Sequence, residues 1–266
     1  MTRVAVVGHI EWVDFIPVAA YPRRGSVLHA EGSFPRAAGG GGVAAATLAD
    51  LGAEVDFFSA LGHDAHGTAA AEQLQERGVT MHVAWREQPT RRAVTLLEPG
   101  GERTIVTIGE RLGPRGGDEL PWELLQQADG AYFTAGDRAA LEHARQARVL
   151  TASPRGGDPL QGDGVPIDAL IFSAHDQDEE ALAERVGDRA RLMVVTEGAE
   201  GGRWSGASTG RWEPAPVPGE PRDSFGCGDS FAAGFTFGLA QGQPIARAAT
   251  VGAECGARCL TRSGAP

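Results

Sequence analysis

The chain has 266 residues, of which 42% are hydrophobic and 22% charged, so it is an ordinary globular chain able to bury a substantial core. The 35 acidic and 24 basic residues give a formal net charge of -11, which disfavours nucleic acid as a partner, and no apolar run approaches the length of a membrane span. Every basic residue is arginine, which excludes chemistry that needs a lysine amine, such as a Schiff base or a Walker phosphate loop.

The first elements in the chain are a buried strand and a glycine-led helix. Residues 4–8, VAVVG, form an apolar run typical of a strand covered on both faces. The further glycines of an NAD-binding turn are missing, which argues against a dehydrogenase. Asp14 follows as a candidate ligand-binding residue, although a solvated loop aspartate fits equally. Glycines 39–42 then open an alanine-rich helix at about Val43 to Leu51, and they favour close approach by a ligand over a flexible linker.

Two segments predict a small β-lid inserted into the domain. Residues 22–36 are irregular and rich in Pro, Gly and Arg, and residues 89–108 contain two β-rich runs around PGG. We expect these segments to pair, to close over the substrate, and to offer an edge through which two copies form a homodimer. His63 and His66 lie between the two segments, but no further ligand at a supporting spacing makes them a metal site.

Beyond the lid, helices and strands alternate as in parallel βαβ units. The patterns predict helices over 122–127, 138–146 and 178–186, strands over 131–134, 148–152, 169–172 and 192–196, and a hairpin over 203–212. We therefore expect a single α/β domain over residues 1–266, with a mainly parallel sheet flanked by helices.

The stretch DSFGCGDSFAAGFTFG, residues 223–238, is the strongest candidate for chemistry. Gly226 and Gly228 bracket Cys227 directly before a helix of small and aromatic residues. Free amides at a helix start bind anions such as phosphate. Asp229 beside such a site is explained if it accepts the proton of an attacking hydroxyl. The local pattern leaves open that Asp229 merely caps the helix.

Four blocks in order resemble the ribokinase-like (PfkB) family of carbohydrate and nucleoside kinases. The glycine cluster with ATLADLGAEVDFFSALGHDAHG resembles the first signature of the family, and PGGERTI resembles its lid hairpin. VVTEGAEGG resembles its nucleotide-binding turn, and DSFGCGD resembles its second signature, DTxGAGD. The resemblance implies an ATP-dependent kinase that uses Mg²⁺, with K⁺ as a further cofactor, and phosphorylates a small-molecule sugar or sugar-like alcohol. No signal segment opens the chain, so we expect a cytoplasmic protein, and the charge and the lack of a long apolar run indicate no nucleic acid or membrane partner.

The resemblance also implies roles for individual residues. It makes Asp229 the general base, and it makes the amides of Gly226, Cys227 and Gly228 the anion hole. The substrate hydroxyls would be held by Asp14, Gly39 and Gly40, and the nucleotide would be lined by Thr196, Gly198 and Gly201. The candidate magnesium ligand is Asp176, and the candidate site for the monovalent cation is Asp223 with Ser224.

Departures from the family pattern keep alternatives open. Val43 stands where an asparagine usually contacts the sugar, so a nucleoside or sugar-phosphate kinase remains an alternative. Ser173 and Asp176 stand where the family has Asn and Glu, and a non-catalytic nucleotide-binding relative is a further alternative. Arg91 and Arg92 either recognise an acidic or phosphorylated substrate or decorate the surface.

Cys227 stands where the family usually has alanine. Because a helix N-terminus stabilises a thiolate, we expect the pKa of this thiol to be lowered and the thiol to be reactive, unless its side chain is buried among apolar groups. The alternative is a small, buried and inert cysteine.

Overall fold

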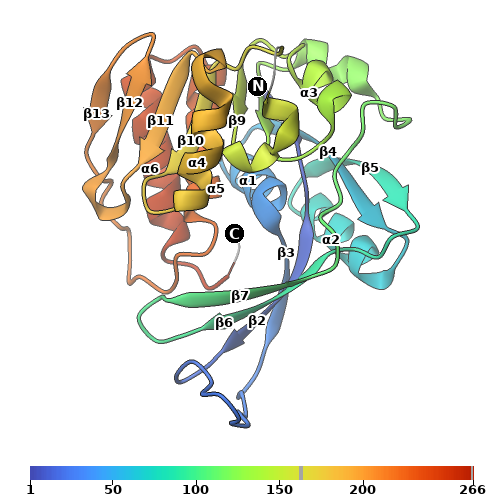
Figure 1. The fold of residues 1–266 in the computed structure, drawn as a ribbon, viewed down its shortest axis with the longest axis vertical. Coiled ribbons are helices and arrows are strands. Elements are labelled where there is room, and N and C mark those ends of the chain that lie inside the picture. Colours follow the sequence, from blue (N-terminus) through green and yellow to red (C-terminus); the bar gives the residue numbers. More distant parts are fainter. Residues whose placement is uncertain (162–163, 265) are drawn as a thin grey trace.

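The strands lie in two sheets in a computed structural model that describes residues 1–161, 164–264 and 266 (Figure 1). The main sheet has the order β13-β12-β11-β10-β9-β8-β1-β4-β5. Its strands are β1 (Arg3–Val7), β4 (Glu54–Gly62), β5 (Val79–Arg86), β8 (Gly130–Phe133), β9 (Leu150–Ala152), β10 (Ala169–Ser173), β11 (Leu192–Thr196), β12 (Gly202–Gly206) and β13 (Gly210–Trp212). All neighbours from β5 to β11 pair in parallel, and β12 and β13 add an antiparallel edge.

Helices cover both faces of the main sheet, because successive side chains of a strand point to opposite faces. In β1, Val4 and Val6 belong to one core and Ala5 and Val7 to the other. The first core also contains residues of α1 (Gly39–Asp50), α2 (Ala65–Gln75), α5 (Cys227–Ala240) and α6 (Ile245–Cys259), and the second contains residues of α3 (Arg138–Ala144) and α4 (Gln177–Val186). The predicted α/β fold class is thereby confirmed.

The small sheet projects from one end of the main body, as Figure 1 shows, and has the order β3-β2-β6-β7. Its strands are β2 (Glu11–Pro17), β3 (Phe34–Ala38), β6 (Arg92–Leu97) and β7 (Arg103–Ile108). Most of the first predicted lid segment, residues 22–33, contains no helix or strand, and β2 takes its place in the sheet. Asp14 therefore lies within a lid strand and not in a loop after β1.

Two further local differences from the sequence patterns concern helices. Residues Trp122–Gln127 form a 3₁₀ helix, the tighter form common in short segments. The predicted helix over 138–146 ends at Ala144. Among the described residues, no helix combines the length and apolar character needed to cross a membrane.

Candidate active site

The carboxyl ends of the parallel strands gather polar residues from distant parts of the chain. His9 follows β1, Ser153 follows β9, and Ser173 and Thr196 end β10 and β11. Ligands of open α/β sheets bind outside these strand ends. The chain also passes here from β1 into β2, so the small sheet begins beside the same edge.

Asp229 lies in the first turn of α5 and faces the start of α1. A Cβ built on Gly40 would lie 3.0 Å from Asp229 Oδ1, so the glycine leaves room directly beside this carboxylate. The pKa of Asp229 is raised to about 7, first by burial and then by the Glu179 carboxylate, against the opposing charges of Arg155 and Arg103. A carboxyl with this pKa can accept a proton near neutral pH.

The glycine turn before α5 has the backbone of an anion-binding loop. Gly226 has φ +73°, a conformation that favours glycine, and its Cα faces Val43. Within the described chain, the Cys227 amide donates a long bond of 3.4 Å to Ser224 O, and no acceptor is found for the amides of Gly226 and Gly228. Val43, only 1% exposed, therefore supports this loop from the core.

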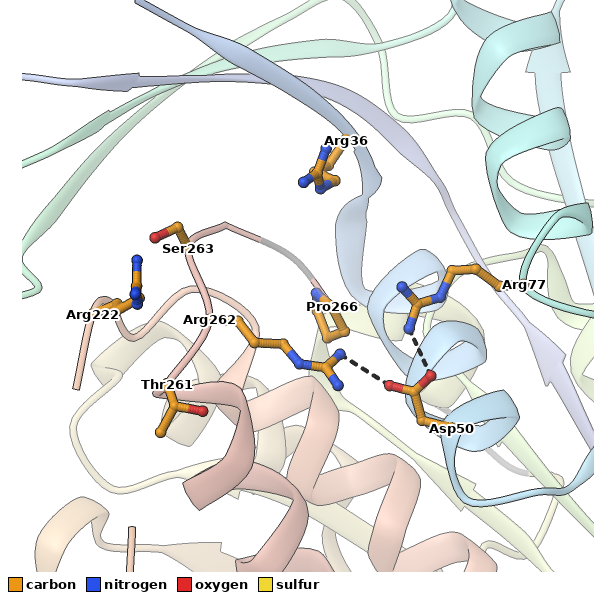
Figure 2. A pocket seen from close by; sticks show the side chains of 8 residues that line it. All are labelled: Arg36, Asp50, Arg77, Arg222, Thr261, Arg262, Ser263 and Pro266. Atoms are coloured by element: carbon orange, nitrogen blue, oxygen red, sulfur yellow. Dashed lines mark hydrogen bonds and ion pairs between the residues drawn. The ribbon is translucent and has the colours of Figure 1, made fainter. Parts of the chain in front are cut away.

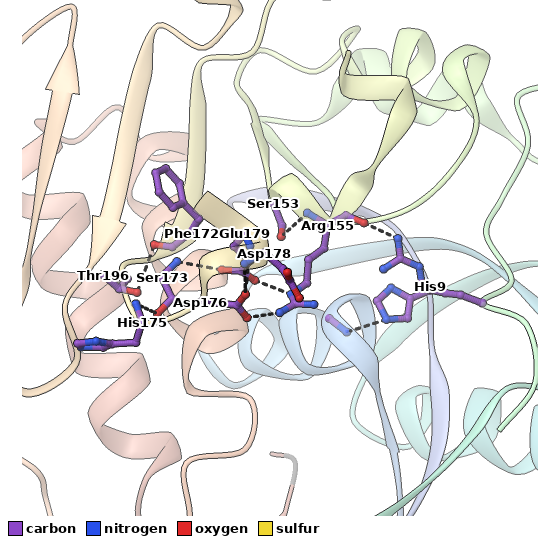
Figure 3. Close-up of polar contacts among 12 residues, drawn as sticks. His9, Ser153, Arg155, Phe172, Ser173, His175, Asp176, Asp178, Glu179 and Thr196 are labelled. Carbon is purple, nitrogen blue, oxygen red and sulfur yellow. Dashed lines mark hydrogen bonds and ion pairs between the residues drawn. The ribbon is translucent and has the colours of Figure 1, made fainter. Parts of the chain in front are cut away.

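Glu179 and Arg155 are site residues that the sequence reasoning missed. Arg155 Nε lies 2.6 Å from Glu179 Oε1, and the same guanidinium pairs with Asp176. Figure 3 shows Arg155 with His9 on one side and Asp176 and Glu179 on the other. The acidic run DQDEE after β10 signalled a carboxylate here, but spacing alone did not identify which one faces Asp229.

Asp176 itself caps α4. Its Oδ1 accepts from the amides of Asp178 and Glu179, both at 3.1 Å. Glu179 Oε2 accepts from Ser173 N at 2.9 Å, which fixes the glutamate at the strand end. Both carboxylates therefore lie near the strand end, and the side chain of Glu179 is the less exposed one, 15% against 32%.

His9 and Glu11 form the opposite wall of the site. The Gly40 amide donates to His9 Nε2 at 3.4 Å, and the Glu11 carboxylate is 3.6 Å from the same nitrogen. Burial, followed by the charges of Arg111, Arg91 and Arg155, holds the pKa of His9 well below its ordinary value of 6.5, so this imidazole is neutral. No sequence motif pointed to His9.

The predicted nucleotide turn lies at the end of β11. Thr196 Oγ1 donates to Phe172 O at 3.3 Å, which ties the ends of β10 and β11 together. Gly198 and Gly201 have φ of +60° and +80°, and a Cβ on Gly201 would overlap the carbonyl oxygen of Trp212. Only glycine therefore fits at residue 201.

Asp223 and Ser224 connect three segments of the chain. Asp223 is 3% exposed, and its two oxygens accept from Phe225 N at 2.9 Å and Gly264 N at 2.8 Å. Arg103 of β7 donates to the Ser224 hydroxyl. The pair thus links the anion loop to the C-terminal segment and to the small sheet.

The expectation of a lowered pKa at Cys227 is wrong. A hydrogen bond with Cys259, followed by burial, raises the pKa of Cys227 well above its ordinary value of 9.0. Cys259, from the end of α6, lies beside Cys227 and also donates to Phe225 O at 3.2 Å. Neighbouring thiols thus outweigh the stabilisation of a thiolate by the helix N-terminus.

A cavity of about 760 Å³ lies away from these residues, between the ends of α1 and α6. Its lining consists of Arg36, Asp50, Arg77, Arg222, Thr261, Arg262, Ser263 and Pro266. Figure 2 shows that Arg77 and Arg262 both pair with Asp50. Because none of the predicted catalytic residues lines this cavity, the strand ends are the candidate active site.

Comparison with known proteins identifies the family of the chain. The pfkB family of carbohydrate kinases matches residues 1–153 and 167–266. The chain is 28% identical to an ATP-dependent ribose-1-phosphate kinase of Halopiger xanaduensis, over 100% of this chain and 94% of the relative. It is 29% identical to the acarbose 7(IV)-phosphotransferase of an Actinoplanes species, over 98% of this chain and 92% of the relative.

Solved structures share the fold. A microbiome-derived acarbose kinase superposes with a TM-score of 0.81 at 25% identity, covering 99% of this chain and 94% of that one. Arabidopsis thaliana ribokinase, complexed with ribose and ATP, gives 0.78 at 20% identity, covering 100% and 95%.

The fold and the kinases among its relatives define the chain as a phosphotransferase with an alcohol group as acceptor. The chain belongs to the pfkB family of carbohydrate kinases, as the resemblance of its four sequence blocks predicted.

Proposed function

We propose that the protein transfers the γ-phosphoryl group of ATP to a hydroxyl of a sugar or sugar-like alcohol, with Asp229 as the general base. The observation that carries this proposal is the Asp229 carboxyl, whose pKa is raised to about 7 between the start of α5 and Gly40. The names of the relatives, a ribose-1-phosphate kinase and an acarbose phosphotransferase, support a carbohydrate acceptor. A nucleoside or a sugar phosphate is the alternative acceptor.

The proposed reaction moves one proton and one phosphoryl group. The acceptor hydroxyl gives its proton to Asp229, its oxygen bonds to the γ-phosphorus, and the bond from that phosphorus to the leaving oxygen of ADP breaks. The amides of Gly226, Cys227 and Gly228 stabilise charge on the transferring group, because a helix start is electropositive. Little covalent chemistry falls to the protein, so catalysis consists mainly of positioning.

The nucleotide would lie along Thr196, Gly198 and Gly201 at the end of β11. Its metal fits this arrangement, because Mg²⁺ on nucleotide phosphates keeps several waters and needs only one or two protein carboxylates. Asp176 remains the candidate metal ligand that the sequence indicated. Glu179 is a second candidate metal ligand, because its carboxylate is near enough to raise the pKa of Asp229. Such an ion would neutralise phosphate charge.

A monovalent cation fits Asp223 and Ser224 less well. Both oxygens of Asp223 already accept amide bonds, and the Arg103 guanidinium supplies a positive charge beside Ser224. K⁺ therefore has no part in the proposed reaction.

The sugar hydroxyls would contact Gly39, Gly40 and Asp14, with the small sheet closing over them. β7 is an edge strand whose Ile105, Val106 and Ile108 are 42%, 56% and 46% exposed. Exposed apolar edges are usually covered, so we also propose that two copies pair through this lid. A sedimentation experiment that finds only monomer at micromolar concentration would contradict the pairing. The use of ATP favours a cytoplasmic location.

The experiment that tests the function measures ADP release with a panel of sugars, sugar acids, polyols, nucleosides and sugar phosphates. Acceptor-dependent ADP release by the wild type, lost in Asp229→Asn, is the expected result. A non-catalytic relative would bind ATP and release no ADP with any acceptor.

A further inference from the structure

We propose that the cavity of about 760 Å³ between the ends of α1 and α6 binds a small anion that carries two phosphoryl groups, such as inorganic pyrophosphate or a sugar bisphosphate. The inference goes beyond the proposed function, because none of the predicted catalytic residues lines this cavity. It gives the protein a second ligand site with its own recognition chemistry.

The lining of this cavity is strongly basic. Its arginines come from separate segments of the chain and are Arg36, Arg77, Arg222 and Arg262. The single acidic side chain in the lining is Asp50, so four positive charges against one negative charge leave an excess of three. The excess is still two when a carboxylate is counted at Pro266. In a chain with a net charge of -11, this basic lining attracts anions to one place.

Asp50 holds two of the arginines in position. Its Oδ1 lies 2.7 Å from Arg77 Nη2 and its Oδ2 lies 2.9 Å from Arg262 Nη1, as Figure 2 shows. A guanidinium has five N–H donors, so each of these arginines keeps donors that the carboxylate does not use. In the part of the chain that the structure describes, the buried Nε of Arg77 has no acceptor. The protein therefore leaves part of the hydrogen-bonding capacity of this lining unused.

The other two arginines of the lining have no carboxylate partner. Arg36 of β3 donates to Pro35 O at 3.1 Å, and its guanidinium carbon lies 5.3 Å from the centroid of the Phe34 ring. The side chain of Arg222, in the segment before α5, is exposed. Among the described residues, neither arginine forms an ion pair. Their paired N–H groups suit phosphate oxygens, because the fork of a guanidinium binds two of them at once.

Neutralisation of helix ends does not explain this arrangement. Cations are favourable near a helix C-terminus, and Arg77 follows α2 as Arg262 follows α6. Over the described residues, however, both guanidinium groups donate to Asp50 and neither donates to a carbonyl oxygen at a helix end. Arg36 lies in a strand and Arg222 in a loop before a helix, so neither belongs to a helix C-terminus. We therefore assign the excess charge to a ligand.

The size and charge of the cavity favour two phosphoryl groups. Its volume lies within the range of about 300–1,000 Å³ that is typical of small-ligand pockets. One phosphate ester group carries about -1.5 to -2 charges near neutral pH, so two such groups balance the excess and one does not. Of the described residues that line the cavity, none is aromatic, so a nucleobase would find no ring to stack on. A phosphorylated compound without a base therefore fits best.

The cavity also lies between segments that lead to the candidate active site. Arg36 comes three residues before Gly39, and Arg222 comes directly before Asp223. A ligand held by both arginines would join β3 of the small sheet to the segment that enters the glycine turn before α5. Arg36 and Arg222 are therefore the residues whose replacement tests the site.

The test is isothermal titration calorimetry of the full chain with inorganic pyrophosphate and with a sugar bisphosphate, at an ionic strength of about 0.15 M and without Mg²⁺. The proteins are the wild type, Arg36→Gln and Arg222→Gln, which should fold because neither arginine holds a carboxylate. Arg247→Gln on α6, whose side chain is 59% exposed, is the control for loss of a positive charge. Orthophosphate is the probe with a single phosphoryl group.

We expect the wild type to bind one equivalent of at least one of the two probes. Each of Arg36→Gln and Arg222→Gln should raise the Kd of that probe about 10-fold to 100-fold, the range of one lost charge-assisted hydrogen bond. The control variant should bind as the wild type does. Absence of binding, equal Kd values in the wild type and both variants, or equal weakening in the control would overturn the inference. Orthophosphate bound as tightly as the better probe would overturn the assignment of two phosphoryl groups.

Titration with ADP separates this cavity from the glycine turn before α5. An unchanged Kd for ADP in Arg222→Gln, together with a raised Kd for the probe, would support a separate site. An equal loss of affinity for ADP and for the probe would place the probe at the glycine turn and overturn the inference. The proposed kinase activity is tested separately, by acceptor-dependent ADP release.

Discussion

Replacing Asp229 with asparagine should stabilise the protein at alkaline pH while removing its activity. The pKa of Asp229 is raised from an ordinary value of 3.8 to about 7, mainly by burial. Between these two values the folded protein holds a proton that the unfolded chain has released. The wild type therefore loses stability as the pH rises through about 7, and a neutral asparagine does not.

The size of the effect follows from this window. At about 1.4 kcal/mol per pH unit, the part of the window between about pH 5 and 7 corresponds to about 3 kcal/mol of unfolding free energy. Asp229 is partly exposed, and solvent screening reduces the expected difference to about 1–2 kcal/mol. Turnover should fall about 10²-fold to 10⁴-fold, because the proton acceptor is lost while the anion hole remains.

The assay is urea unfolding of both proteins at about pH 5 and about pH 8.5, together with ADP release. The control is Glu254→Gln, which removes a carboxylate whose side chain is 48% exposed on α6. A stability difference between Asp229→Asn and wild type that does not grow with pH would refute the electrostatic reasoning. Near-normal turnover of the variant would refute the role as base.

Three further substitutions or modifications test the geometry around Asp229. Gly40→Ala puts a Cβ 3.0 Å from Asp229 Oδ1 and should lower kcat about 10-fold to 100-fold. The control is Gly117→Ala, where a Cβ meets nothing within 4 Å and kcat should not change. Equal kinetics of the two variants would contradict the contact. Glu179→Gln removes a charge that raises the pKa of Asp229, so the acidic limb of the kcat/KM profile should move to lower pH, and an unmoved limb would show that the two carboxylates do not interact. The Cys227 thiol, whose pKa is raised, should react with iodoacetamide at about pH 8 more slowly than free cysteine, and faster labelling in peptide maps would contradict its pairing with Cys259.

Local patterns predicted the fold class and the glycine turn before α5. These patterns are the apolar run of β1, the glycines at the start of α1 and the turn before α5. Each depends on residues that are adjacent in the chain, so the sequence alone indicates it. The position of Asp229 after Gly226 and Gly228 predicted a carboxylate at a helix start, and the structure places it there.

Tertiary structure decided which groups meet across loops. Only the end of the first predicted lid segment lies in the small sheet, in β3, and β2 supplies a strand that the composition did not indicate, because strand pairing and not composition defines a sheet. Cys227 lies against Cys259, and this contact reversed the expected direction of its pKa shift.

The charged residues of the site also meet only in the folded chain. Glu11 and Arg91 meet although they are far apart in the chain, and Arg111 reaches the same site from the other end of the lid hairpin. Sequence spacing does not encode such distances, because electrostatic energy depends on separation in space and on burial. The sequence by itself therefore determined that this protein has a glycine turn at a helix start with a carboxylate beside it. Only the folded chain brings Glu179 close enough to raise the pKa of that carboxylate. It also brings Arg91 and Arg111 to the buried Glu11.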